Sequence, residues 1–183
     1  MTLSLNIATL IRLVALNFLL ALVLTQRAEA QLFIANYGSG KVGAYTTSGT
    51  SINADLITVL SPSGIAVSGT NLYVVNSTAG TIGAYTTGGA TVNASLITGL
   101  DSNAILGAAI SGSTIYVVNN RTGKIGAYTT SGSTTNANLI TGLINPTGIA
   151  VSGSNIYVAN FSTGNIGVYT TSGATVNAGL ITG

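Results

Sequence analysis

The stretch Ile115 to Leu143, IYVVNNRTGKIGAYTTSGSTTNANLITGL, decides the fold because nearly the same text occurs four times in the chain. The other copies begin at Leu32 (LFIANYGSGKVGAYTTSGTSINADLITVL), Leu72 (LYVVNSTAGTIGAYTTGGATVNASLITGL) and Ile156 (IYVANFSTGNIGVYTTSGATVNAGLITG). Self-similarity over this length indicates a repeat protein in which each copy is one structural unit.

The repeat period is defined by an asparagine that closes the first apolar run of each copy and by a later tyrosine. Both series advance by 40, 43 and 41 residues, so the length changes fall in the segments between copies. Loops absorb such insertions more readily than packed strands do. The asparagines are Asn36, Asn76, Asn119 and Asn160, and the tyrosines are Tyr45, Tyr85, Tyr128 and Tyr169.

Residues 1–30 have the layout of a cleavable secretory signal. Arg12 supplies a positive charge, Leu13 to Thr25 is largely apolar, and Ala28-Glu29-Ala30 is a small-x-small cleavage site before Gln31. An uncleaved membrane anchor is the alternative, but the apolar run is short for a bilayer span. The sequence therefore predicts export to the extracellular space, the cell surface or the periplasm, with no stable membrane span after signal removal.

Residues 31–183 are expected to form one domain of low charge. The sequence pI of about 9.0 depends on few groups, so it does not indicate nucleic-acid binding. Cysteine is absent, and the domain must therefore be held by strand pairing and burial rather than by disulfides. The charged residues after position 30 are Lys41, Arg121, Lys124, Asp55 and Asp101.

Each unit reads as four short β-strands. In the last unit these are Gly148 to Ser152, Ile156 to Asn160, Asn165 to Thr171 and Thr175 to Thr182, separated by the Gly, Ser and Asn residues of tight hairpins. Ile115 to Val118 places apolar side chains on both of its faces, which predicts a strand covered on both sides. Stacked four-stranded sheets at this period are typical of a β-propeller.

The run Gly64-Ile-Ala-Val, followed by Leu72-Tyr-Val-Val-Asn and Thr81-Ile-Gly-Ala-Tyr, resembles the NHL-type repeat, whose usual form is GIAVD, a VYVAD-like strand and an R-I-x-x-F strand. The resemblance covers nearly all of residues 32–183 and implies a propeller fold. Ser68, Asn76 and Thr81 stand where NHL repeats carry Asp, His and Arg. The chain is most similar to the uncharged, Thr/Gly/Asn-rich versions found in secreted bacterial proteins.

Counting the inner strands predicts an all-β, β-propeller-like array of about 3.75 four-stranded antiparallel blades, with units beginning near residues 32, 64, 107 and 148. The GIAV-type strand occurs at Gly64, at Gly148 and in altered form at Gly107, whereas the first unit lacks one. Three arrangements fit this count: a strained four-bladed ring, an open arc with exposed edges, or an arc completed by another chain. A fragment of a larger propeller fits it equally well.

The sequence offers few residues for catalysis. It contains no His and no Cys, which excludes Ser–His and Cys–His pairs and imidazole or thiolate metal ligands. Asp55 and Asp101 occupy different places in their repeats, so no carboxylate pair is expected. Propellers that resemble gluconolactonases use Glu, Asp and Asn around a metal, and no Glu follows residue 30. We expect a non-enzymatic protein without catalytic residues, metal or cofactor, and a propeller-type lactonase or lyase is the lesser alternative.

Candidate ligand contacts gather at the turn between the second and third strands of each unit. Carboxamides there would suit sugar hydroxyls or a peptide backbone, and the basic side chains would suit a weak contact with an anionic group. The competing interpretation is that each asparagine caps its own hairpin and that the basic residues lie in a solvated turn. The candidates are Asn36, Asn76, Asn119, Asn120, Arg121, Lys124 and Asn160.

These features predict a secreted binding or structural scaffold that contacts a protein or a polysaccharide of the cell surface or matrix through its blade-end loops. The alternative is a self-assembling subunit of an extracellular fibre or sheet, in which copies of the chain form a homo-oligomer through open blade edges. Thr-rich strands with few charges offer little resistance to such pairing.

Overall fold

The computed structural model describes residues 30–183, which form fifteen β-strands. The predicted secretory signal, residues 1–30, lies outside the described residues except for Ala30. Within residues 30–183, no helix has the length and apolar character needed to cross a membrane.

The strands form four antiparallel sheets, which we call blades 1 to 4. Blade 1 has three strands: β1 (Gln31–Asn36), β2 (Lys41–Thr46) and β3 (Ser51–Thr58). Blade 2 has four: β4 (Pro62–Ser68), β5 (Asn71–Asn76), β6 (Thr81–Thr86) and β7 (Thr91–Ile97). Blade 3 comprises β8 (Ile105–Ser111), β9 (Thr114–Asn119), β10 (Lys124–Thr129) and β11 (Thr134–Ile140). Blade 4 comprises β12 (Pro146–Ser152), β13 (Asn155–Asn160), β14 (Asn165–Thr170) and β15 (Thr175–Thr182).

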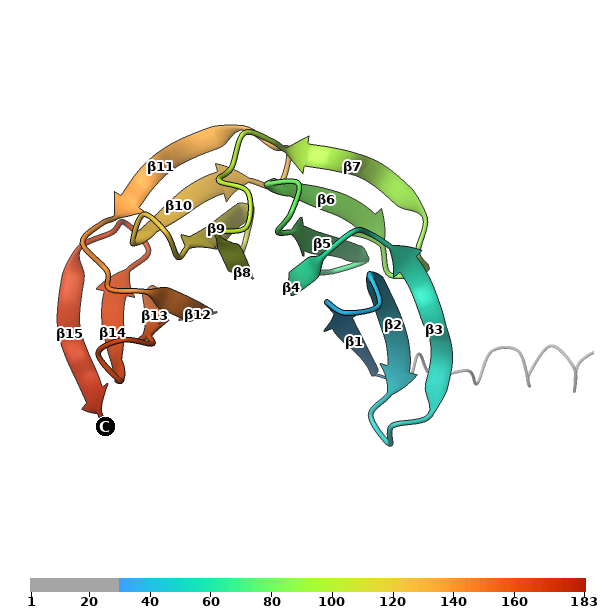
Figure 1. Cartoon of the computed structure of the whole chain (residues 1–183), viewed down its shortest axis with the longest axis horizontal. Coiled ribbons are helices and arrows are strands. Elements are labelled where there is room, and N and C mark those ends of the chain that lie inside the picture. The colour runs from blue at the N-terminus through green and yellow to red at the C-terminus, as the bar shows by residue number, and fades with distance from the viewer. Residues whose placement is uncertain (1–29) are drawn as a thin grey trace, which may run out of the picture.

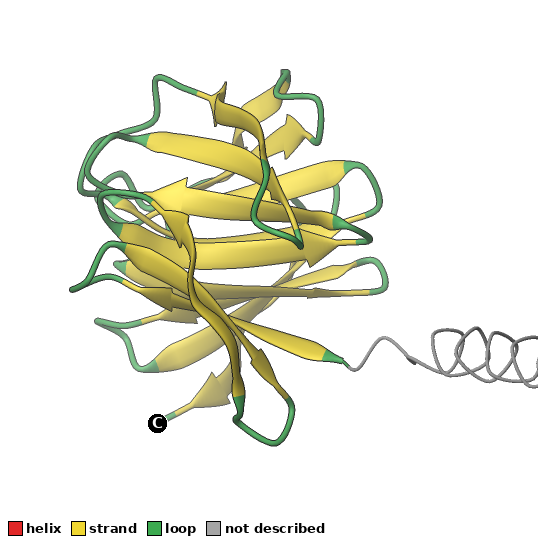
Figure 2. Ribbon diagram, turned by 90° about the vertical axis from the view of Figure 1, so that its right-hand side faces the viewer, coloured by secondary structure: helices red, strands yellow, loops and turns green. Residues whose placement is uncertain are grey.

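The blades stand side by side in an open arc (Figure 1). The inner strands β4, β8 and β12 line its concave side, and the outer strands β3, β7, β11 and β15 form its convex side. Figure 2 shows the sheets stacked on one another, with the turns gathered at two opposite rims. The predicted all-β, propeller-like array is confirmed, with three complete blades and a first blade that lacks its inner strand. The described chain forms an arc rather than a closed four-bladed ring.

The core consists of three apolar clusters, and each cluster lies between two neighbouring blades. β9 shows why the strands are apolar on both faces, because one face packs on blade 2 and the other on blade 4. Ile115 and Val117 belong to the cluster shared with blade 2, whereas Tyr116 and Val118 belong to the cluster shared with blade 4. All four residues are at most 4% exposed, which confirms that this strand is covered on both sides.

The inner strands of blades 2 and 3 approach each other closely, and this explains the glycine at position 64, which begins the GIAV-type run of blade 2. A Cβ atom on Gly64 would lie 3.1 Å from the Cα atom of Gly107 in the next blade. Beside it, the hydroxyl of Ser63 donates a hydrogen bond of 3.0 Å to the carbonyl oxygen of Ile105. A larger side chain at position 64 would therefore push blades 2 and 3 apart.

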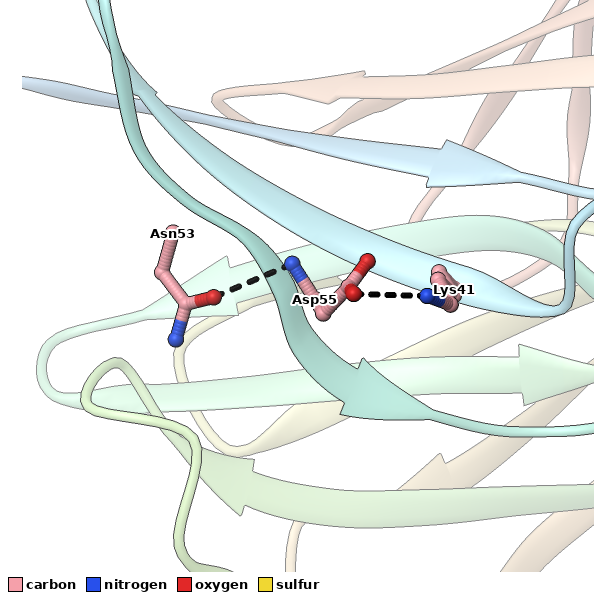
Figure 3. Close-up of polar contacts among 3 residues, drawn as sticks. All are labelled: Lys41, Asn53 and Asp55. Atoms are coloured by element: carbon pink, nitrogen blue, oxygen red, sulfur yellow. Dashed lines mark hydrogen bonds and ion pairs between the residues drawn. The ribbon is translucent and has the colours of Figure 1, made fainter.

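Each outer strand carries a bulge that the alternation of apolar residues does not reveal. In blade 1, Val42 pairs with Ile57 and Ala44 pairs with Asn53, so the outer strand is longer than its partner between these pairs. Asn53 Oδ1 accepts the backbone N–H of Asp55 at 3.0 Å and holds the bulge, as Figure 3 shows. The equivalent asparagines of the other blades, Asn93, Asn136 and Asn177, make the same bond to the residue two positions later.

The bulge brings a leucine against a glycine turn of the next blade. In blade 2, Leu96 meets Gly132 of blade 3, where an added Cβ atom would lie 2.4 Å from the Leu96 carbonyl oxygen. Gly132 has φ +95, a backbone conformation that favours glycine. The same joint links Leu56 to Gly89 and Leu139 to Gly173. Each neighbouring pair of blades is thus joined by the same contact.

Candidate functional site

The predicted contact residues all lie at or next to one rim of the arc, which we call the linker face. It consists of the turns 37–40, 77–80, 120–123 and 161–164, together with the linkers 59–61, 98–104 and 141–145 that lead from one blade to the next. Backbone hydrogen bonds fix each linker to a turn. The N–H groups of Val59, Leu100 and Leu143 donate to the carbonyl oxygens of Gly40, Gly80 and Gly123 at 2.9, 3.1 and 3.0 Å.

Three of the repeated asparagines cap their own turns. The Oδ1 atoms of Asn36, Asn76 and Asn119 each accept a backbone N–H three residues later, and each distance is 3.2 Å. Such side-chain bonds are the ordinary way in which asparagine stabilises a tight turn. The carboxamide nitrogen is still available for a second contact, since Asn119 Nδ2 also donates to Asp101 Oδ2 at 2.5 Å.

The capping interpretation is wrong for the fourth asparagine, Asn160. Its Nδ2 donates to Asn165 Oδ1 at 3.0 Å, and Thr163 Oγ1 donates to the same oxygen at 2.9 Å. The physical reason is Asn165, because this position holds Lys41, Thr81 or Lys124 in the other blades, none of which offers an amide oxygen. Asn160 is buried, and its Oδ1 has no hydrogen-bond partner within residues 30–183. A hollow of about 160 Å³ adjoins it.

Asn120 and Arg121 connect their turn to the linkers on either side. Asn120 Nδ2 donates to the carbonyl oxygen of Pro146 at 3.0 Å and to Asn145 Oδ1. Asn145 in turn donates to Ser162 Oγ at 3.1 Å, which links blades 3 and 4. Arg121 Nη2 donates to the carbonyl oxygen of Ser102 at 3.1 Å. These side chains therefore order the rim, and Asn145 is a member of this network that the repeat pattern did not identify.

The lysines contribute little electrostatic organisation. Lys41 Nζ lies 2.6 Å from Asp55 Oδ2 in an exposed ion pair on the outer edge of blade 1 (Figure 3). Lys124 takes part in no ion pair within the described part of the chain. The described residues also contain no group of three or more His, Cys, Asp or Glu side chains placed to hold a metal ion.

The linker face also carries exposed apolar side chains that are not among the predicted contact residues. Tyr37 and Phe161 follow the repeated asparagine and are 57% and 74% exposed. Leu60 and Ile144, in the linkers beside these turns, are 68% and 56% exposed. A shallow hollow of about 400 Å³ lies between the first turn and Leu60. The signal in the sequence was a break in the repeat, since the positions of Tyr37 and Phe161 hold Ser77 and Asn120 in the central blades.

Three of the four repeated tyrosines, Tyr85, Tyr128 and Tyr169, are buried in the clusters between blades. A Cβ atom on Gly83 would lie 2.7 Å from a ring carbon of Tyr85, so the glycine makes room for the ring of the tyrosine two residues later. Burial raises the pKa of Tyr85, Tyr128 and Tyr169, and the negative charge of Asp101 raises the pKa of Tyr128 further. These phenols are neutral at physiological pH and pack between blades.

Solved structures of the same fold include binding proteins and an enzyme. A chain of the nidogen/laminin complex is 22% identical to this chain, with a TM-score of 0.66 over 79% of this chain and 59% of that one. Catalytically inactive virginiamycin B lyase from Staphylococcus aureus, solved with quinupristin, is 20% identical, with a TM-score of 0.63 over 85% and 54%. An auxiliary nutrient binding protein from Bacteroides ovatus is 12% identical, with a TM-score of 0.61 over 78% and 42%.

No protein-family profile matches the sequence, and no curated protein matches it either. The similarity to solved structures therefore shows the fold alone, and the described chain is a β-propeller-like repeat protein. It spans about half the length of most of these structures, for example 46%, 52% and 59% of three of them.

Proposed function

We propose that this protein is an exported, non-enzymatic scaffold whose linker face binds a protein or a polysaccharide of the cell surface or matrix. The observation that carries the proposal is the pair of exposed aromatic side chains, Tyr37 and Phe161, on turns of the same rim. Export rests on the predicted signal at residues 1–30. We further propose that the repeats are of the NHL type, in their secreted, Thr/Gly/Asn-rich form.

The linker face suits binding because its backbone is ordered before a partner arrives. Asn36 caps the turn that carries Tyr37, and Asn145 holds Ser162 beside Phe161. A rigid surface loses little conformational entropy when it binds, which favours affinity. Aromatic rings add a large contact area with few rotatable bonds and stack on sugar rings or on apolar protein surfaces.

Two observations support a function without catalysis. The acidic side chains after residue 30 are engaged separately, Asp55 with Lys41 and Asp101 with Asn119, so neither is paired with a second carboxylate. The inactive form of the S. aureus lyase is a histidine-to-alanine variant, and this chain has no histidine. Among the two kinds of partner, a protein is supported by the structural neighbour in the nidogen/laminin complex.

The proposal is tested by replacing Phe161 and Tyr37 with alanine, singly and together. The matched control is Val92→Ala, because Val92 is 61% exposed but lies on the outer strand of blade 2, away from the linker face. Binding to a cell-envelope fraction of the source organism is measured by cosedimentation. Each aromatic replacement should weaken binding about fivefold, the equivalent of about 1 kcal/mol. Unchanged binding by the double variant would refute the role of this rim, and turnover of a lactone by the purified protein would refute the non-enzymatic assignment.

A further inference from the structure

The free face of blade 1, at the N-terminal end of the arc, exposes residues whose equivalents in the other blades lie in the core. Leu32 and Ile34 on β1 are 46% and 50% exposed. Their equivalents in the other three blades are almost completely inaccessible, at 0 to 2%, because each of them packs against the preceding blade. These equivalents are Leu72, Ile115 and Ile156 for the first position, and Val74, Val117 and Val158 for the second.

The last face of the arc shows the same change. Ile181 on β15 is 55% exposed, whereas Ile57, Ile97 and Ile140 at the same position are 2 to 4% exposed and pack against the following blade. Leu180 is 49% exposed, although the equivalent leucines of blades 1 to 3 each contact a glycine turn. At the opposite end of the arc, the glycine turn of blade 1 lacks the leucine contact, since no atom lies within 4 Å of a Cβ atom built on Gly49.

The two open faces are therefore the two halves of one joint. In the joint between blades 1 and 2, the face of blade 1 that carries Leu56 and Ile57 packs on the face of blade 2 that carries Leu72 and Val74. The equivalent residues form the other two internal joints. We propose that a second copy of this chain covers these faces, with blade 4 of one copy packed head to tail on blade 1 of the other. The partner is identified by the surface itself, because the second copy presents the residue types and the bulge-to-glycine contact that the three internal joints already use.

Two copies are expected to close a ring. A head-to-tail interface forms a closed ring when its rotation completes a turn and an open filament when it does not. The chain spans 52% of the S. aureus lyase and 59% of the nidogen/laminin chain, so two arcs supply about the length of one such structure. The expected assembly has two identical joints and leaves both copies of the linker face accessible.

The test measures the mass of the full chain, processed as its host processes it, by light scattering after size-exclusion chromatography. The wild-type protein should have the mass of two chains. Ile34→Asp and Ile181→Asp should each give the mass of one chain, because each places a carboxylate in both joints of the ring. Both positions are already solvent-exposed in the arc, so circular dichroism should show that the variants keep their β-structure. Val92→Asp, at an equally exposed position of an internal blade, should leave the mass at two chains.

Mixing the two variants distinguishes a head-to-tail contact from a symmetric one. Ile34→Asp protein retains an intact blade 4 and Ile181→Asp protein retains an intact blade 1, so an equimolar mixture should form a two-chain particle through one unaltered joint. Three results would overturn the proposal. They are a wild-type monomer at every concentration, no recovery of the two-chain mass on mixing, and a one-chain mass for only one of the two variants. A ladder of larger sizes that both variants abolish would support the joint and refute closure at two copies. None of these outcomes depends on ligand binding by Phe161 and Tyr37, so the two proposals fail separately.

Discussion

Replacement of Gly132 by alanine tests how the blades are held together. An added Cβ atom at Gly132 would lie 2.4 Å from the carbonyl oxygen of Leu96 in the preceding blade. Gly49 occupies the same place in blade 1, with φ +87 against +95 for Gly132, and no atom lies within 4 Å of its added Cβ atom. The two variants therefore share the backbone strain, and only Gly132→Ala adds a collision between blades.

The expected difference follows from these contacts. A non-glycine residue in a left-handed conformation costs about 1–2 kcal/mol, and Gly49→Ala should lower the free energy of unfolding by that amount. At position 132 the neighbour is a backbone oxygen, which no side-chain rotation can move, so overpacking should add about 1–3 kcal/mol. Gly132→Ala should thus be the less stable variant by about 1–3 kcal/mol.

The assay is urea unfolding followed by circular dichroism. Both variants are made in the Ile181→Asp background, so that Gly49 does not meet Leu180 of a second copy. An equal loss of stability in the two variants would mean that backbone strain explains the whole effect. The close contact between Leu96 and Gly132 would then contribute nothing to stability.

Three further predictions concern single side chains. Burial and the charge of Asp101 raise the pKa of Tyr128 above its usual value of 10.0, so the phenol loses its proton at lower pH in the unfolded chain than in the folded one. The contribution of Tyr128 to folding stability is therefore present below about pH 10 and is lost as the pH rises through the folded-state pKa. Tyr128→Phe should reduce the fall in the urea midpoint above pH 10. Asn76→Ala should lower the free energy of unfolding by about 0.5–1.5 kcal/mol through loss of the bond to the Ala79 N–H, and an effect near zero in urea unfolding would contradict the cap. Lys41→Ala should change the free energy of unfolding by less than about 0.5 kcal/mol, because the ion pair with Asp55 is exposed. A loss several times larger at low salt that disappears in 1 M salt would contradict this prediction.

The sequence predicted the local architecture well because every strand and turn is encoded four times. The apolar run Ile115 to Val118, the glycine of the GIAV-type strand and the Gly/Asn/Ser turns each have a local physical meaning that one copy reveals. Their repetition predicted the blade count and the missing inner strand of blade 1, which the sheets confirm. Whether the array closes depends on the rotation between blades, which no local pattern encodes, so ring and arc could not be separated.

The features that the sequence did not predict involve contacts between distant residues. The meeting of Leu96 with Gly132 requires the bulge in β7, and a bulge breaks the alternation from which strands are recognised. Asn160 carries the same sequence signal as Asn76, yet its conformation is set by Asn165, a residue outside the repeated asparagine motif. The exposed aromatic side chains of the linker face, Tyr37 and Phe161, stand at positions that depart from the repeat. The candidate contacts were predicted mainly from asparagines that conform to the repeat, and they did not include these two residues.

The division of the core into separate clusters, one for each pair of blades, bears on how the molecule opens in solution. When each module touches only its neighbours, the free energy that resists opening is a sum of nearest-neighbour terms. Strands β9 and β10 of blade 3 can expose their amides only by breaking two joints, whereas β14 and β15 at the end of the arc need to break only one. Deuterium uptake should therefore quicken from the middle blades toward both ends, and docking of a second copy should flatten that gradient.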